Sequence, residues 1–186
     1  MTVFFENPEL FIPLLAMVCL LVGSGFFSSS ETALFFLSSD ELADFQKRGR
    51  ASELRVVALL KDPDRLLTAV LFWNLVINLA YFSCGVVITE RLIEMKSAGL
   101  AGAFSVVSLS TMIICGEVVP KSSAVMFRGG LSRLVSFPLA FAVRAFDPLA
   151  PTFRRVTRSM RKMFWPTIRR ETVSYTHLRA HETADN

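Results

Sequence analysis

One carboxylate stands in an otherwise apolar part of the chain and is the strongest candidate for chemistry. Glu117 lies in the segment Gly116-Glu-Val-Val-Pro-Lys121, at the end of a long apolar run. A carboxylate at membrane depth is costly and is usually functional. Pro120 has no N–H to donate to the carbonyl four residues earlier, so the carbonyl of Gly116 is freed beside Glu117. Such freed backbone is tolerated in a membrane only where protein or a polar cavity covers it.

Two other apolar runs carry hydroxyl and amide groups at helical spacing. Ser24 and Ser28 are four residues apart, as are Asn74 and Asn78, so each pair shares one face of a helix. Two readings of each pair are open. Small serines often let membrane helices pack closely, and asparagines often bond across helices. Alternatively, both pairs offer oxygen ligands to a shared site.

A common depth favours the shared site. Charged residues mark the ends of the three runs that lie on one side of the membrane: Asp40, Arg65 and Arg128. Counted from these markers along ideal helices, Ser28, Asn74 and Glu117 all lie roughly 13–18 Å inside. Hydroxyl, amide and carbonyl oxygens with a single carboxylate are ligands for a hard cation, with Mg²⁺ the first choice and Na⁺ or Ca²⁺ behind it.

The elements that must position these groups are membrane-spanning helices. Of the 186 residues, 52% are apolar and only 19% are charged, which excludes a disordered or nucleic-acid-binding chain. The ranges 10–30, 66–89 and 97–116 contain no charged residue, and each can cross a bilayer as a helix. A fourth stretch, 134–143, is short and contains Pro138, so it predicts an interfacial or re-entrant helix. The expected fold class is an all-α membrane protein with three transmembrane helices and juxtamembrane helices.

The distribution of basic residues predicts the orientation. The loop 40–65 holds six Lys and Arg residues, whereas the loop between the second and third runs holds two. The positive-inside rule therefore places the first loop and the basic segment after residue 127 in the cytoplasm, with the N-terminus outside. Anionic lipid at that surface accounts for the net charge of +4 without nucleic acid. Ser39-Asp-Glu-Leu-Ala predicts the start of an amphipathic surface helix within the loop.

The remaining reactive residues argue against other classes of protein. Cys19, Cys84 and Cys115 lie in the apolar runs without Cys-x-x-Cys spacing, so neither a disulfide framework nor a zinc site is indicated. We expect them to be buried packing residues. The spacing of His177 and His181 is weak support for a metal site. An enzyme is not expected, since no paired nucleophile and base appears.

Three motifs together resemble the transmembrane domain of the CNNM/CorC family of magnesium transporters, over about residues 5–165. They are Gly25-Phe-Phe-Ser-Ser-Ser-Glu-Thr-Ala-Leu34, Phe72-Trp-Asn-Leu-Val-Ile-Asn-Leu-Ala80 and Gly116-Glu-Val-Val-Pro-Lys121. The resemblance implies a homodimer that binds dehydrated Mg²⁺ between three helices of each protomer. It implies the following ion ligands: Ser24, Ser28, Asn74, the Gly116 carbonyl and Glu117, with Ser30, Glu31 and Asn78 as second choices and Pro120 as a helix kink.

The same resemblance implies a function. Family members are thought to move Mg²⁺ out of the cytosol across the bacterial inner membrane, with Na⁺ as counter-ion, under the control of cytosolic CBS modules. CBS modules are therefore expected in the full-length protein. The alternative is a non-transporting membrane anchor or Mg²⁺ sensor that signals to those modules.

The expected domain organisation follows the motifs and the composition of the C-terminal residues. Residues 1–165 form the transmembrane domain, and 166–172 begin a cytosolic linker. Residues 173–186 are expected to be a non-native tail, because Val173-Ser-Tyr-Thr-His-Leu-Arg-Ala-His-Glu-Thr183 looks like a translated sequencing adapter.

Overall fold

The structure, a computed structural model, describes residues 8–153 and 155, with side chains from residue 10 onward. The chain divides into two compact units, Met1–Pro148 and Leu149–Asn186. All regular elements in the described part are helical, and the first unit holds eight of them. In the second unit, residues 150–153 and 155 are helical. The predicted linker and tail, 166–186, lie outside the described residues.

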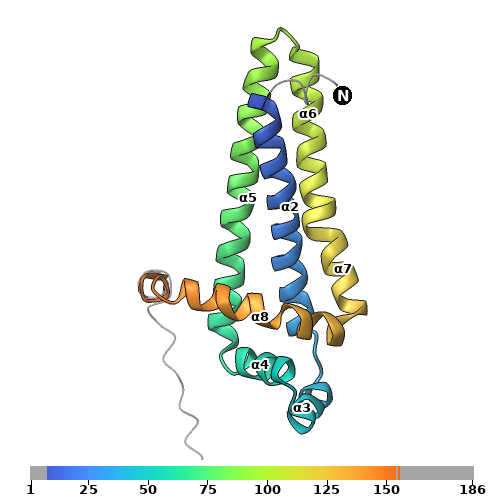
Figure 1. Cartoon of the computed structure of the whole chain (residues 1–186), viewed down its shortest axis with the longest axis vertical. Helices are drawn as coiled ribbons and strands as arrows, with labels where there is room; N and C mark the ends of the chain where they lie inside the picture. The colour runs from blue at the N-terminus through green and yellow to red at the C-terminus, as the bar shows by residue number, and fades with distance from the viewer. Residues whose placement is uncertain (1–7, 154, 156–186) are drawn as a thin grey trace, which may run out of the picture. The chain divides into compact units, whose positions relative to one another are not determined.

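Three long helical segments form the body of the first unit (Figure 1). They are α2 (Pro8–Phe35), α5 (Pro63–Glu94) and a third segment in which α6 (Ala98–Thr111) continues through the π-helix η1 (Met112–Val118) into α7 (Val119–Met126). Each is long and apolar enough to cross a membrane. The three predicted spans and the all-α fold class are confirmed.

Each span is longer than the uncharged run that predicted it. Helix α5, for example, begins at Pro63, where Asp62 caps it by accepting the backbone N–H of Arg65, and continues past Glu90 to Glu94. Proline at the first helical position suits a helix start, because no N–H partner is needed there. Charged residues at the ends of a span reach the membrane surface, so they extend the helix without a desolvation cost.

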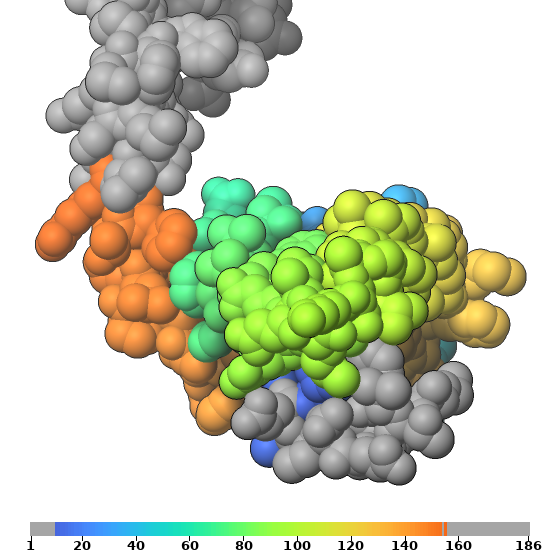
Figure 2. Space-filling model, turned by 90° about the horizontal axis from the view of Figure 1, so that it is seen from above, coloured from blue at the N-terminus to red at the C-terminus, as the bar shows by residue number. Residues whose placement is uncertain are grey.

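A buried cluster holds the upper halves of the spans together. Leu10 and Met17 of α2 pack with Tyr81, Ile88 and Leu92 of α5, all almost fully buried. The Tyr81 hydroxyl donates to the Ser108 carbonyl across 3.1 Å. Figure 2 looks along the spans from the end where α5 meets α6, and there the two helices lie side by side.

The outward faces of the spans remain apolar and exposed. Cys19 and Cys115 lie on these faces and Cys84 is half-buried, so the prediction that all three cysteines are buried is wrong. Three helices cannot surround one another, so each keeps a face directed toward lipid or another protein.

Three further helices lie at the end of the spans that is predicted to be cytoplasmic (Figure 1). They are α3 (Ser39–Arg48), α4 (Ala51–Leu60) and α8 (Arg128–Phe146). The predicted surface helix is confirmed as α3, although its N-cap is Ser38 and a second helix follows. Ser38 and Glu41 form a reciprocal capping box, which satisfies two backbone N–H groups at the helix start.

Helix α8 crosses the lower ends of the spans and includes the predicted fourth helix, with Pro138 inside it. It packs against α2, α4 and α5. The Trp73 indole N–H donates to the Ala142 carbonyl at 2.9 Å. Arg65 donates two hydrogen bonds to the Asp147 carboxylate, at 2.7 and 2.6 Å. These contacts fasten α8 to the first turns of α5.

Candidate cation site

The polar residues of the three spans meet at one point. The Ser24 side chain is fully buried, and its hydroxyl lies 3.1 Å from Asn74 Oδ1 and 2.9 Å from Asn78 Oδ1. One hydroxyl proton can satisfy only one of these two acceptors at a time. The three side-chain oxygens therefore have a single hydroxyl proton between them, and their remaining lone pairs are available to a cation.

Asn78 joins this cluster to the carboxylate. Its amide Nδ2 donates to Glu117 Oε1 at 3.3 Å, while its Oδ1 accepts from Ser24. Since the amide has one nitrogen and one oxygen, the bond to Glu117 fixes which end faces Ser24. Glu117 is half-buried in the described unit. The cluster thus combines one negative charge with neutral oxygens.

Ser28 and Gly116 complete the first-choice set. The buried Ser28 hydroxyl lies 3.5 Å from the backbone carbonyl oxygen of Glu117, at the outer limit for a hydrogen bond. Gly116 is buried, and a Cβ there would lie 3.2 Å from Ser24 Oγ and 3.0 Å from Met112 Sδ. Only glycine lets the third span approach Ser24 so closely.

The backbone around Glu117 departs from the α-helix. Across η1 the turns widen, and at its end the N–H of Val119 bonds to the carbonyl of Ile114, five residues earlier. Pro120 predicts disturbed hydrogen bonding at Gly116, and the structure shows a π-helix in place of a simple kink. Gly25 accommodates the proline, because a Cβ at Gly25 would lie 3.2 Å from the Pro120 ring. Single π-turns within α-helices are frequent at functional sites.

Of the second-choice residues, Asn78 takes part in the cluster, whereas Ser30 and Glu31 make other contacts. Asn78 lies at the centre of the cluster, as described above. Ser30 is buried, but its hydroxyl donates to the carbonyl of Phe26 in its own helix, at 2.6 Å. Glu31 lies 4.0 Å from Lys121 Nζ in a separate ion pair between α2 and α7. The hydrogen bond of Ser30 and the ion pair of Glu31 therefore do not connect these residues to the cluster.

The donor set consists of oxygens with one carboxylate. Within the part of the chain that the structure describes, no group of three or more His, Cys, Asp and Glu residues could hold a metal. Soft or borderline metals such as zinc prefer sulfur and nitrogen ligands. The cluster around Ser24 offers instead hydroxyl, amide, backbone and carboxylate oxygens, which suit Mg²⁺, Na⁺ or Ca²⁺.

Sequence reasoning missed a buried carboxylate at the cytoplasmic end. The Glu53 side chain is 0% exposed, and its Oε1 lies 3.9 Å from Arg48 and 3.6 Å from Arg133. Neither of its oxygens has a hydrogen-bond partner among the described residues. Glu53 stands among other charges in the basic loop, so no pattern distinguished it from a solvated residue.

Comparisons with known proteins agree with this arrangement. A profile of the cyclin M transmembrane N-terminal domain, CNNM, matches residues 14–180. The UPF0053 inner membrane protein YfjD of Escherichia coli is 32% identical over 140 residues, which are 75% of this chain and 32% of that protein. A UPF0053 protein of Haemophilus influenzae is 29% identical over 147 residues, which are 79% of this chain and 34% of that protein.

The chain therefore spans about a third of the length of these curated relatives. The profile match covers most of α2, the other two spans, the Ser24 cluster and the three cytoplasmic helices. The chain is an integral membrane protein that belongs to the CNNM transmembrane-domain family.

Proposed function

We propose that the chain is the ion-binding core of a magnesium transporter, with Mg²⁺ as its cargo. The observation that carries this proposal is the convergence of Ser24, Asn74 and Asn78, where three oxygens share one hydroxyl proton beside the Glu117 carboxylate. A cation would take the lone pairs that the single proton leaves unsatisfied. Glu117 would supply the charge that a neutral cluster lacks.

The ligands proposed are Ser24, Ser28, Asn74, the Gly116 carbonyl and Glu117, with Asn78 as an additional ligand or as the residue that orients Glu117. Mg²⁺ prefers octahedral oxygen coordination and releases its water reluctantly. A site of neutral oxygens with one carboxylate offsets part of that cost and still lets the ion leave. Binding that is too tight would stop transport.

The wider activity rests on family membership. We propose efflux from the cytosol coupled to Na⁺ entry, in a homodimer located in the bacterial inner membrane. The E. coli relative is named an inner membrane protein. The exposed apolar faces of the spans suit both lipid and a second protomer. CBS modules would lie in the part of the full-length protein beyond this domain.

The ion site is tested by thermal unfolding of the purified chain with and without MgCl₂. We expect Mg²⁺ to raise Tm in the wild type, because a ligand that binds only the folded state stabilises it. Glu117→Gln, Asn74→Ala and Asn78→Ala should each lose most of this shift. Ser83→Ala and Glu90→Gln are matched controls on exposed positions of α5 and should keep it. An unchanged shift in Glu117→Gln and Asn74→Ala contradicts the site.

Flux distinguishes transport from sensing. In liposomes that contain the longer protein with its cytosolic part, Mg²⁺ movement should depend on Glu117. Mg²⁺ binding without flux would instead identify the non-transporting anchor or sensor.

A further inference from the structure

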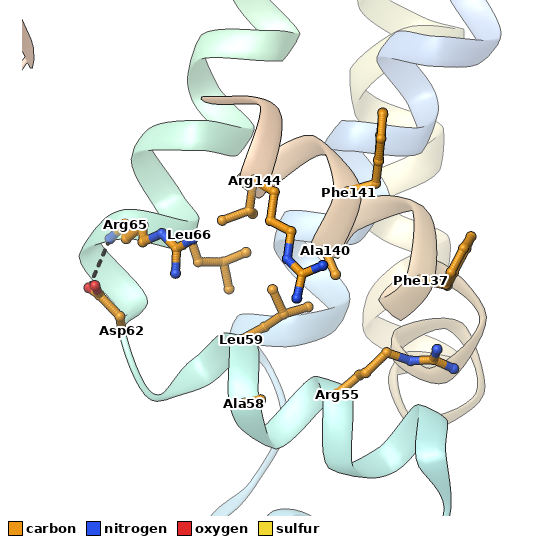
Figure 3. A pocket seen from close by; sticks show the side chains of 11 residues that line it. Arg55, Ala58, Leu59, Asp62, Arg65, Leu66, Phe137, Ala140, Phe141 and Arg144 are labelled. Atoms are coloured by element: carbon orange, nitrogen blue, oxygen red, sulfur yellow. Dashed lines mark hydrogen bonds between the residues drawn. The ribbon is translucent and has the colours of Figure 1, made fainter. Parts of the chain in front are cut away.

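A cavity lies at the cytoplasmic end, and its lining contains none of the residues of the Ser24 cluster. It has a volume of about 590 Å³ and opens between α4, the first turn of α5 and α8 (Figure 3). Volumes of this size are typical of small-molecule sites. Its walls combine apolar side chains, among them Leu59, Leu66 and Phe141, with arginines from all three helices.

Two of the arginines offer positive charge to the cavity. Arg55 Nε is buried and has no hydrogen-bond partner, and neither Arg55 nor Arg144 forms an ion pair within the described residues. A buried guanidinium N–H without an acceptor is costly. The third arginine, Arg65, is held by Asp147, and the one acidic wall residue, Asp62, accepts the backbone N–H of Arg65. The Arg65–Asp147 pair is neutral, so Arg55 and Arg144 supply two positive charges and Asp62 one negative charge, which leaves this region with a net charge of +1.

The arginine and phenylalanine side chains occupy different levels of the cavity. In Figure 3 the Arg144 guanidinium reaches toward Leu59 on α4, and Arg55 lies beneath Phe137. The Arg55 guanidinium is 5.5 Å from the centre of the Phe137 ring. Phe137 and Phe141 are largely exposed, and in Figure 3 they point toward the side where the spans run. A ligand that fits has an anionic end near the arginines and an apolar end along the phenylalanines.

The position of the cavity identifies the ligand class. It lies beside the start of the α5 span at Pro63, so the predicted orientation places it at the level of the cytoplasmic membrane surface. Anionic phospholipids of the cytoplasmic leaflet present phosphate and acyl chains together at that level. We infer that this cavity binds one anionic phospholipid, with its phosphate between Arg55 and Arg144 and an acyl chain against Leu66 and Phe141.

Lipid retention by the purified full chain tests the inference. Native mass spectrometry would compare phosphatidylglycerol with phosphatidylcholine of identical acyl chains. We expect the wild type to retain phosphatidylglycerol roughly thirtyfold better, on the scale of two arginines at an anionic surface. The double variant Arg55→Gln/Arg144→Gln should lose this preference. Arg50→Gln, an exposed arginine at the start of α4, is the matched control and should keep it.

A second variant tests the cavity independently, in case the double arginine variant fails to fold. Ala140→Trp keeps every arginine but fills the cavity from the α8 wall, and it should reduce phosphatidylglycerol retention to a similar extent. Equal retention by the wild type and both variants overturns the inference. Displacement of the lipid by inorganic phosphate at equal concentration would show a free-phosphate site instead. Loss of retention when the chain carries its downstream cytosolic part would show a protein-docking surface, which also overturns it.

Discussion

Ser24 is the residue on which the proposed ion site depends most. Its hydroxyl is fully buried, and it faces amide oxygens from α5 on one side and the Gly116 backbone on the other. Hydroxyl groups can rotate, so Ser24 can donate to an amide oxygen or turn its lone pairs toward an ion. This versatility suits a site that must be stable both with and without its cargo.

Gly116→Ala should disturb the site through Ser24. The added methyl would lie 3.0 Å from Met112 Sδ and 3.2 Å from Ser24 Oγ, so both must shift. We expect a destabilisation of about 1–3 kcal/mol, as for other overpacked cores. The Mg²⁺-dependent rise in Tm should fall by more than the loss of stability accounts for. Thermal unfolding with and without MgCl₂ measures both effects.

Gly102→Ala provides the matched control for this substitution. Gly102 lies in the same span, and nothing stands within 4 Å of an added Cβ. Alanine is the better helix former, so stability should rise by about 0.5–1 kcal/mol with the Mg²⁺ response unchanged. Equal Mg²⁺ responses in the two variants would show that the close approach at Gly116 has no role in ion binding.

At the scale of elements, ion pairs and caps fasten the cytoplasmic helices to the spans. The Glu41 carboxylate accepts the Ser38 N–H at 2.8 Å and lies 3.1 Å from Arg128 Nε at the start of α8. The backbone bond from Ser38, followed by the Arg128 guanidinium, lowers the pKa of Glu41 below its ordinary value. Glu41 thus both caps α3 and joins α3 to α8.

The attachment of α3 should be sensitive to acid. The pKa of Glu41 is lower in the folded state than its ordinary value of 4.5, so its carboxylate stabilises the fold at pH values above 4.5. This contribution is lost as the pH falls through the folded pKa. Glu41→Gln should therefore be less stable than the wild type at pH 7, by about 1 kcal/mol. The difference should vanish as the pH falls through the folded pKa of Glu41. Urea unfolding across this range measures it, and a constant difference contradicts the assignment.

The Arg65–Asp147 pair should couple α5 to α8. Its two short hydrogen bonds are bidentate, but both side chains are more than a third exposed, so solvent weakens the pair. A double-mutant cycle with Arg65→Gln and Asp147→Asn should give a coupling of about 1 kcal/mol. The cycle for Arg91 and Glu94, an exposed pair within α5, should give less than about 0.5 kcal/mol. Equal couplings would contradict a fastening role for Asp147.

The sequence predicts helices better than their ends or their mutual rotation. Uncharged runs predict the three spans because burial in lipid requires them, whereas Asp64 and Arg91 continue α5 at the membrane surface, where charge is tolerated. The pairing of Asn74 and Asn78 follows from helical spacing. Which of them meets Glu117 depends on how α5 rotates against the third span, and no local pattern encodes that. Pro120 indicates a disturbed backbone, but the π-helix depends on packing against Gly25.

At the scale of the whole molecule, the orientation in the membrane is a prediction from basic residues alone. In a background without the three native cysteines, Lys61→Cys should be protected from a membrane-impermeant maleimide in intact cells and labelled after lysis. Ala98→Cys, at the start of α6, should be labelled in intact cells. Both positions are exposed, so access depends on the side of the membrane. The reverse pattern would contradict a cytoplasmic position for α3, α4 and α8.

The ion pairs that fasten the cytoplasmic helices also set an order of assembly during synthesis. Arg65 can bond to Asp147 only after that residue, 82 positions later in the chain, has been synthesised. Glu41 likewise depends on the synthesis of Arg128, 87 positions later. A ribosome releases the chain from its N-terminus, so α3 and α5 emerge long before α8 exists. The spans can enter the membrane one after another, each satisfying its own backbone. The contacts at the cytoplasmic end can be completed only when residue 147 has left the ribosome, so α8 is the last helix of the first unit to pack into place.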